Sequence, residues 1–208
     1  MKHQLDIENW KRREHFHFFR QFDEPFFGVC VKVDCTIAYA QSKEKGYSFF
    51  LFYLHKILMA ANRLEPFRYR IEEQQVMVYD VVNASPTINR ADGTFGFAYL
   101  DYDESFDLFT EKANVAIREV RQSKGLFPAV SGENVIHFSS MPWLDFTAVS
   151  HARSFTFQDS CPKISLGKMT EQDGQKSMPL SIHVHHALMD GQDVALFVDL
   201  FQDLMNEV

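Results

Sequence analysis

The chain has 208 residues, a mass of 24.2 kDa and 46% hydrophobic residues, so it can bury one sizeable core, and we expect one domain spanning residues 1–208. Its formal net charge of -7 disfavours a nucleic-acid partner, because phosphate binding calls for a basic face. No apolar run is long enough to span a membrane, and the start Met1-Lys2-His3 lacks the apolar core of a signal peptide. The sequence therefore predicts a cytoplasmic protein with no membrane partner.

The first predicted elements are a strand and a buried helix. Residues 27–36 carry Val29, Val31 and Val33 at every second position, which is the period of a strand. Residues 48–64 are apolar and contain neither Gly nor Pro, which favours a buried helix.

Two β-hairpins and an amphipathic helix are predicted next. The paired runs of the hairpins are 67–71 with 76–80, and 87–90 with 94–100. Gly93 supplies the positive φ that a tight turn needs. Residues 106–120 then place apolar side chains three and four apart, which predicts a helix that ends near Gly125.

The C-terminal part changes from a strand period to a helix period. Residues 179–186 alternate, with Leu180, Ile182 and Val184 on one face and Ser181, His183 and His185 on the other. The same alternation places His186 on the apolar face. From Val194 onward apolar residues recur every three or four positions, which predicts a helix, and Gly191 marks the change.

The placement of His186 makes it a candidate general base. An imidazole shielded from water at a strand end keeps its neutral form and can accept a proton near pH 7. The pattern alone leaves open a hydrogen-bonded structural histidine. His183 and His185 share a face, but no Cys or carboxylate stands at ligand spacing beside them, so no metal is expected.

The cysteines and phenylalanines add two further indications. The cysteines at 30, 35 and 161 form no CxxC pair, which is typical of buried small side chains in a reducing compartment. The chain has 21 Phe, an unusually large number, and the core of such a domain could bury some of them. Their excess indicates an aromatic-lined pocket or an oligomer interface.

Three motifs in order resemble the chloramphenicol acetyltransferase family. They are Asn9-Trp10-Lys11-Arg12-Arg13-Glu14-His15-Phe16-His17-Phe18-Phe19, Pro142-Trp143-Leu144-Asp145-Phe146, and His185-His186-Ala187-Leu188-Met189-Asp190-Gly191. The likeness runs from about Asp6 to Asn206. The third motif alone is short and recurs in dihydrolipoamide acyltransferase cores, but all three at these separations are specific.

The resemblance implies a fold, an activity and partners. The fold would be an α/β (α+β) two-layer sandwich of the coenzyme A-dependent acyltransferase type, with a mixed β-sheet flanked by helices, in a single acetyltransferase domain. The activity would be direct acetyl transfer from acetyl-CoA to a hydroxyl of an aromatic or apolar small molecule of the chloramphenicol type, which confers antibiotic resistance. Family members are homotrimers with each site between subunits, and no metal is involved.

The resemblance also implies roles for individual residues. His186 would remove the acceptor's proton, and Asp190 would pair with Arg12 to hold the loop that presents His186. Without the resemblance, the charged run Lys11-Arg12-Arg13-Glu14 favours a solvated surface cation at Arg12. The acceptor-side residues would be Phe18, Phe19, Phe27, Phe95 and the water-holding Ser165. Lys168 would lie near the coenzyme phosphate.

One position departs from the family pattern. Relatives carry a Ser as the seventh residue of Pro-Trp-x-x-Phe-x-Ser, where its hydroxyl binds the oxyanion, and this chain has Ala148 there. Loss of one oxyanion donor lowers the rate about a hundred- to a thousandfold. Thr147 or Ser150 could substitute for it.

Two other functions therefore stay open. A dihydrolipoamide acyltransferase core would share the fold and the base, but the lipoyl domains and Ala/Pro-rich linkers of such chains are not present here. A trimeric small-molecule binding protein with little turnover would keep the pocket, and Ala148 is consistent with that.

Overall fold

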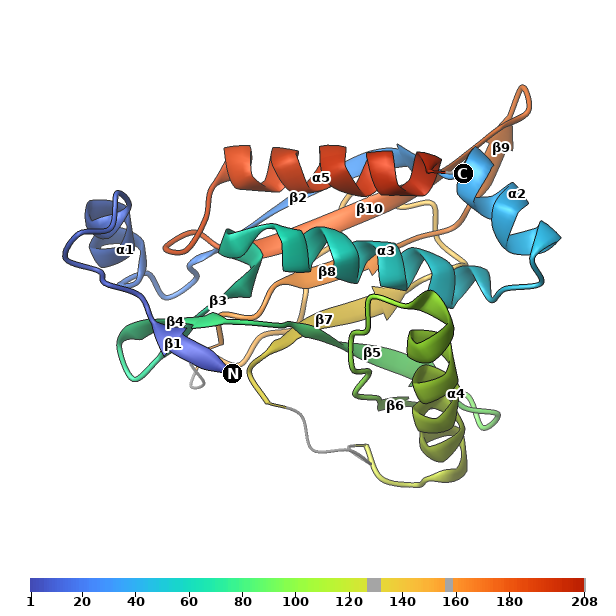
Figure 1. Ribbon diagram of the computed structural model, residues 1–208, viewed down its shortest axis with the longest axis horizontal. Coiled ribbons are helices and arrows are strands. Elements are labelled where there is room, and N and C mark those ends of the chain that lie inside the picture. The colour runs from blue at the N-terminus through green and yellow to red at the C-terminus, as the bar shows by residue number, and fades with distance from the viewer. Residues whose placement is uncertain (127–131, 156–158, 208) are drawn as a thin grey trace.

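The computed structural model describes residues 1–126, 132–155 and 159–207 (Figure 1). Its helices are α1 (Arg13–Phe19), α2 (Thr36–Glu44), α3 (Phe49–Arg63), the 3-10 helix η1 (Glu65–Arg68), α4 (Phe106–Gln122) and α5 (Gly191–Asn206). Its strands are β1 (Lys2–Gln4), β2 (Phe26–Asp34), β3 (Tyr69–Glu72), β4 (Gln75–Tyr79), β5 (Asn83–Asn89), β6 (Phe95–Phe97), β7 (Val135–Ser140), β8 (Lys163–Leu166), β9 (Thr170–Gln172) and β10 (Gln175–His185).

Most strands form one mixed sheet in the order β2-β10-β8-β7-β5-β6, with β9 paired to the start of β10. The β7 strand runs parallel to β8 and to β5, whereas β10 is antiparallel to both β2 and β8. A smaller sheet contains β1, β4 and β3. The mixed sheet that the resemblance implied is confirmed.

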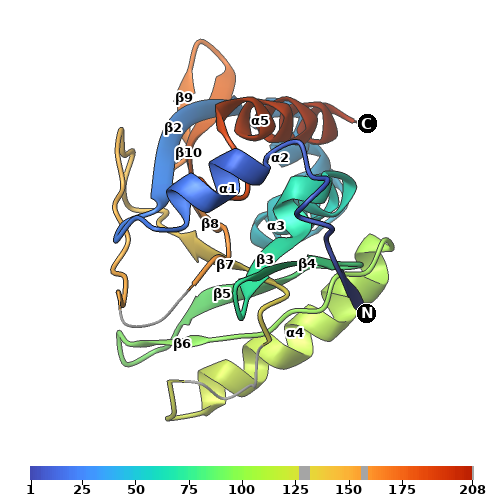
Figure 2. The same ribbon diagram turned by 90° about the vertical axis from the view of Figure 1, so that its left-hand side faces the viewer.

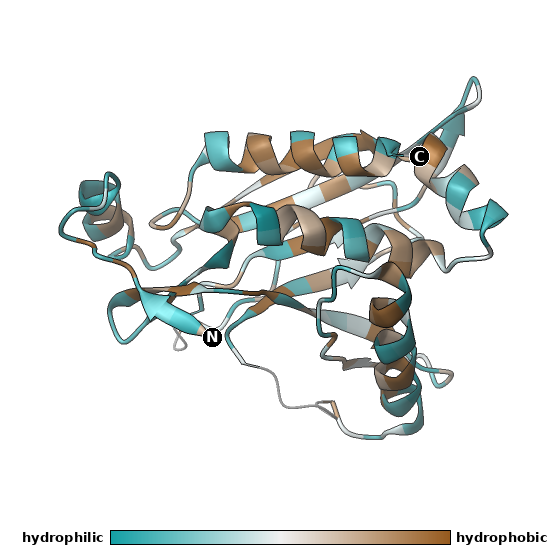
Figure 3. Cartoon of the chain, in the orientation of Figure 1, coloured by the Kyte–Doolittle hydropathy of each residue, from teal (hydrophilic) through white to brown (hydrophobic). Residues whose placement is uncertain are grey.

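The two faces of the main sheet differ in chemistry. Seen from the α1 end, α3 and α5 lie on one side of the sheet (Figure 2). Ile164, Leu180 and Ile182 point to that side and are fully buried in the core, and apolar residues also run along α3 and α5 (Figure 3). The opposite face carries polar side chains, because residues directly paired across a sheet point the same way. One such row reads Ser85, His137, Lys163, His183 and Gly28 from β5 to β2.

Local sequence explains where several elements begin. The hydroxyls of Ser48 and Ser105 accept hydrogen bonds from Leu51 and Leu108, so each caps its helix, and the helices predicted over 48–64 and 106–120 are confirmed. The first hairpin turns on Glu73 and Gln74, both at positive φ.

Other boundaries differ from the prediction. Residues 67 and 68 belong to η1 rather than to a strand, because Pro66 lies in its first turn, where a missing N–H costs no hydrogen bond. The second hairpin pairs only through β6, with an isolated bridge between Ala84 and Leu100. The helices α1 and α2 and the strand β8 were not predicted.

Within the described ranges, no helix is both long and apolar enough to cross a bilayer. The three cysteines are free thiols.

Candidate active site

His186 follows the last residue of β10 and is fixed by its backbone and its ring. Its N–H donates to the Pro25 carbonyl at 2.8 Å, which ties the end of β10 to the start of β2. The imidazole stacks on Phe19, with ring centroids 3.9 Å apart, and lies 4.6 Å from the Phe27 ring. His186, Phe19 and Phe27 are therefore brought together as predicted.

The hydrogen bonds of the imidazole select its tautomer. Nδ1 lies 3.3 Å from the Met189 carbonyl, which can only accept, so Nδ1 carries the proton. Nε2 has no protein partner among the described residues, and its lone pair is free. This is the form that a general base requires.

Asp190 and Arg12 hold the turn that carries His186. Arg12 Nη1 contacts Asp190 Oδ2 at 2.5 Å, and Arg12 Nη2 donates to the His186 carbonyl at 3.2 Å. One guanidinium therefore clamps both ends of the turn between β10 and α5. Asp190 also caps α5, because its Oδ1 accepts from the Gln192 N–H while its own N–H donates to Asp193.

The charge state of Asp190 follows from these contacts. Burial by itself would raise the pKa of Asp190, but the hydrogen bond and the charge of Arg12 and the Gln192 N–H outweigh it, so the pKa lies below its usual value. Asp190 is consequently ionised at neutral pH. Arg12 is thus no free surface cation, since only 11% of its side chain is exposed.

The short helix α1 carries Arg12 at its N-cap and presents aromatic rings beside His186. Phe16 is fully buried and packs against Trp10, which anchors the helix. Phe18 leaves 59% of its surface exposed and contacts Phe19 edge to face. An exposed aromatic surface therefore adjoins the base.

A cavity of about 720 Å³ opens on the polar face of the sheet. Its wall includes polar side chains from three neighbouring strands, namely Ser85 and Thr87 on β5, His137 and Ser139 on β7, and Lys163 on β8. The facing wall contains His151, Arg153 and Asp159, which follow the Pro142-Trp143 motif. The volume suits a small molecule.

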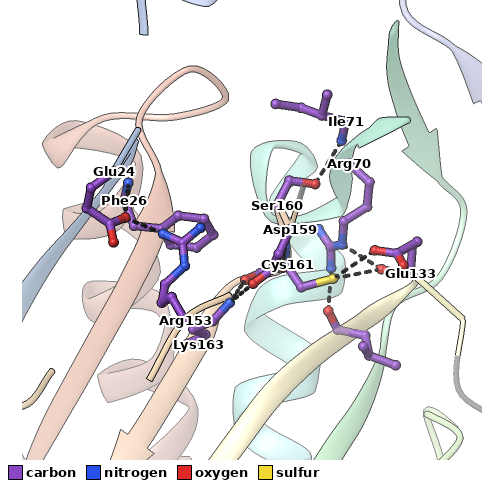
Figure 4. Close-up of polar contacts among 11 residues, drawn as sticks. Glu24, Phe26, Arg70, Ile71, Glu133, Arg153, Asp159, Ser160, Cys161 and Lys163 are labelled. Atoms are coloured by element: carbon purple, nitrogen blue, oxygen red, sulfur yellow. Dashed lines mark hydrogen bonds and ion pairs between the residues drawn. The ribbon is translucent and has the colours of Figure 1, made fainter. Parts of the chain in front are cut away.

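The lysine and the arginine that line this cavity are each paired with a carboxylate (Figure 4). Lys163, only 8% exposed, binds the Asp159 carboxylate and donates to the Cys161 carbonyl at 3.2 Å. Arg153 binds Glu24, and its guanidinium lies 3.7 Å from the centroid of the Phe26 ring. Burial would raise the pKa of Asp159, but the charge of Lys163 outweighs it, so Asp159 is ionised at neutral pH.

The histidines of the cavity are neutral at physiological pH. Burial, followed by the positive charge of Lys163, lowers the pKa of His137 to about 4. Burial, followed by the neighbouring His183, lowers the pKa of His151 to about 4 as well. Each neutral ring offers one hydrogen-bond donor and one acceptor. The His183 ring lies over Gly28, where a Cβ atom would come within 2.3 Å of it.

One cluster of side chains in the cavity has the residue types that can ligate a metal ion. Ligand atoms of His137, Asp159 and Cys161 lie within 4.8 Å of one another. Asp159 is already bound to Lys163, and burial raises the pKa of the Cys161 thiol to about 12, which disfavours the thiolate that a metal needs. The arrangement is therefore better suited to hydrogen bonding than to holding an ion.

The remaining predicted residues lie away from His186. Ser165 is fully buried in β8, and its hydroxyl has no hydrogen-bond partner in the described part of the chain. Phe95 is 45% exposed on β6 and contacts Phe97, which lines the cavity. Lys168 is exposed, with its N–H bound to the Leu144 carbonyl, and Ala148 is exposed too. The roles that the resemblance implies for Ser165, Phe95 and Lys168 therefore stay predictions.

His186 and the cavity lie on opposite faces of the sheet. His186 contacts Phe27, which pairs with the core residue Val184, whereas the cavity lies on the face of Lys163 and Ser139. Ser165 pairs with Ser181, and His186 follows Ser181 by five residues, or about 16 Å along an extended strand. Sequence reasoning missed the cavity residues, although alternate polar positions in β7 and β8 signal a polar face.

Comparison with known proteins agrees with the motifs. Residues 1–202 match the family described as "Chloramphenicol acetyltransferase". The chain is 29% identical to chloramphenicol acetyltransferase 3 of Escherichia coli over 97% of this chain and 96% of that protein. It is 27% identical to a chloramphenicol acetyltransferase of Staphylococcus aureus over 98% and 96% of the respective chains.

Solved structures show the same relationship. A chloramphenicol acetyltransferase superposes with a TM-score of 0.91 at 31% identity, covering 99% of this chain and 100% of that one. A probable dihydrolipoamide acetyltransferase of Listeria monocytogenes, at a TM-score of 0.68 and 15% identity over 92% and 88% of the two chains, shares the fold. By its motifs, its fold and these matches over nearly the whole chain, the protein belongs to the chloramphenicol acetyltransferase family.

Proposed function

We propose that this protein is an acetyltransferase that moves an acetyl group from acetyl-CoA to a hydroxyl of a small molecule. The observation that carries the proposal is the environment of His186. Its Nε2 has no hydrogen-bond partner among the described residues, whereas its Nδ1 is bound to Met189, its ring stacks on Phe19 and its backbone N–H is bound to Pro25. The Arg12–Asp190 pair positions this group without reaching the substrate. The whole chain acts as one acetyltransferase domain.

The transfer needs one base, and no acyl-enzyme forms. His186 Nε2 takes the proton of the acceptor hydroxyl as that oxygen bonds to the thioester carbonyl carbon. The carbon–sulfur bond then breaks, and the imidazolium returns the proton to the departing thiolate. General-base catalysis of this kind contributes about two to four orders of magnitude in rate.

The site is completed between copies of the chain in a homotrimer. Since the base and the cavity lie on opposite faces of one sheet, His186 of one copy meets the cavity of the next. The exposed rings on α1 support an interface there, because large exposed apolar side chains mark contact surfaces. In this arrangement Ser165 and Phe95 belong to the acceptor side, and Lys168 lies at the coenzyme side.

The first acceptor to test is chloramphenicol, since the similar proteins are named for it. Phe18, Phe19 and Phe27 can pack on an aromatic acceptor beside His186. The free thiols support a reducing cytoplasm as the site of action. A binding protein with little turnover is the second candidate, and Ala148 is the residue that favours it.

A thiol-release assay with acetyl-CoA and a panel of alcohols tests the activity. His186→Ala should lower kcat about a hundred- to ten-thousandfold. His185→Ala is the matched control, because its ring contacts Phe26 and its Nδ1 accepts the Ala187 N–H, so it should lose far less turnover per folded molecule. Equal losses would refute the assignment of the base, and no thiol release with any alcohol would favour the binding protein.

A further inference from the structure

One peptide group connects His186 to a carboxylate on α5. The Met189 carbonyl lies 3.3 Å from His186 Nδ1, and the N–H of the same peptide unit, on Asp190, donates to Asp193 Oδ2 at 2.9 Å. The C=O and N–H of a trans peptide point in opposite directions, so the imidazole and the carboxylate lie at opposite ends of one dipole. A chain of two hydrogen bonds therefore runs from Asp193 through the peptide to the base.

The peptide unit between Met189 and Asp190 has little freedom to turn. Met189 is fully buried in the core. The Asp190 side chain is held by the Arg12 guanidinium and by the Gln192 N–H. Any remaining rotation of this peptide plane would change the direction of the Met189 carbonyl, and the hydrogen bond to Asp193 opposes that rotation. Asp193 thus helps to direct the carbonyl at the imidazole.

The charge of Asp193 adds to this geometric effect. A hydrogen bond to a carboxylate polarises the peptide that donates it, so the carbonyl at the other end becomes a stronger acceptor. When His186 Nε2 takes the proton of the acceptor hydroxyl, the positive charge of the imidazolium is shared with Nδ1, and the bond from Nδ1 to the carbonyl becomes charge-assisted. The carboxylate therefore favours both the tautomer with its proton on Nδ1 and the imidazolium that forms during the transfer.

We propose that Asp193 is a positioning residue for the base, which acts on His186 through the peptide between Met189 and Asp190 and does not touch the substrate. The inference rests on the acetyl transfer proposed above and adds one residue to its machinery. The family motifs do not reach this position, since the last of them ends at Gly191, so the resemblance assigns Asp193 no role.

Four variants in the thiol-release assay separate the hydrogen bond from the charge. Asp193→Ala removes both and should lower kcat about two- to tenfold, the equivalent of one neutral hydrogen bond, with little change in KM. Asp193→Asn keeps an oxygen that can accept from the Asp190 N–H, so its kcat should lie between those of Asp193→Ala and the wild type. Asp193→Glu should keep kcat near the wild type, because Glu is a usual residue at this position of a capping box. Asp199→Asn is the matched control, because it removes an exposed carboxylate of the same helix about 9 Å further along, and it should leave kcat unchanged.

The tautomer of His186 gives a readout that a purely structural role would not change. Nitrogen NMR distinguishes a protonated from an unprotonated ring nitrogen, and the signals of His186 are identified by their loss in His186→Ala. In the wild type at neutral pH, the unprotonated nitrogen should be Nε2. In Asp193→Ala a larger share of the molecules should carry the proton on Nε2, whereas Asp193→Glu and Asp199→Asn should match the wild type.

The outcomes separate this inference from the proposed activity. If Asp193→Ala lowers the free energy of unfolding but changes neither kcat nor the tautomer, Asp193 only caps α5, and the inference is overturned. An equal loss of kcat in Asp199→Asn would show a general effect of charge, which also overturns it. If the wild type acetylates no alcohol, the proposed activity fails, but the tautomers of the wild type and of Asp193→Ala still decide the role of Asp193. If Asp193→Ala does not fold, Asp193→Asn provides the same comparison.

Discussion

The clamp formed by Arg12 gives the sharpest quantitative prediction. Arg12→Ala removes an ion pair at 2.5 Å to Asp190 and a hydrogen bond at 3.2 Å to the His186 carbonyl. A hydrogen bond from a charged donor contributes about 1.5–3 kcal/mol, and a partly exposed ion pair contributes about 0.2–1 kcal/mol. Since 39% of the Asp190 side chain is exposed, we take the low end of both ranges and expect a loss of about 2 kcal/mol in the free energy of unfolding.

A double-mutant cycle isolates the contact between the two residues. Asp190→Asn removes the charge but keeps a side chain that caps α5, so its cost should reflect the lost ion pair alone. Denaturant unfolding of both single variants and of the double variant should give a coupling energy of about 0.5–1 kcal/mol. Strict additivity would show that the pair does not interact in solution.

Turnover distinguishes positioning from simple stabilisation. If the clamp orients His186, kcat measured well below the melting temperature should fall in Arg12→Ala while KM changes little. Arg13→Ala is the control, because Arg13 is 46% exposed and pairs with the 72% exposed Glu8, so stability and kcat should both stay near the wild type. An unchanged kcat in Arg12→Ala would refute the positioning role.

Three further predictions concern assembly, the oxyanion and acid stability. Sedimentation equilibrium should give a trimer, and a mass near 24.2 kDa at micromolar concentration would refute the site between copies. Ala148→Ser should raise kcat by less than about a hundredfold with little change in KM, because the new hydroxyl stabilises only the transition state. If kcat rises with no acceptor, the oxyanion is bound by another group, and Thr147 and Ser150 are the next residues to test. Because the folded-state pKa of Asp190 is depressed, its stabilisation is present above the unfolded pKa near 4 and is lost as pH falls through the folded value, so Asp190→Asn should be less acid-sensitive than the wild type below about pH 4 in denaturant titrations.

The elements that the sequence predicted are those with a strong local signal. The helices α3 and α4 have serine caps and long apolar stripes, and β10 alternates over most of its length. The strand β8 was missed although Lys163 and Ser165 alternate with Ile164 and Leu166, because a run of only four residues is too short to distinguish a strand from a loop. The helix α2 buries only Ala38 and Ser42, which is too little apolar surface to mark a helix face.

Contacts in the candidate site between residues far apart in the sequence could be predicted only where a family motif indicated them. Arg12 and Asp190 are separated by 178 residues, and no local pattern could pair them, whereas the family motifs did. The cavity has no counterpart among those motifs. Its facing wall at His151 and Arg153 belongs to an irregular segment, and its position depends on contacts with Phe26 and His183 across the fold.

The polar face links assembly to acceptor binding. A sheet whose helices cover one face leaves the other to water, to a ligand or to another protein surface. Here that face carries hydroxyls and neutral imidazoles beside apolar side chains such as Phe97 and Phe138. An apolar face would favour tight association of copies but would recognise a polar acceptor poorly. If His186 of one copy serves the cavity of the next, the base reaches the acceptor only in the assembled protein. Dilution below the dissociation constant of the assembly would then abolish turnover, because it removes the base from every cavity at once.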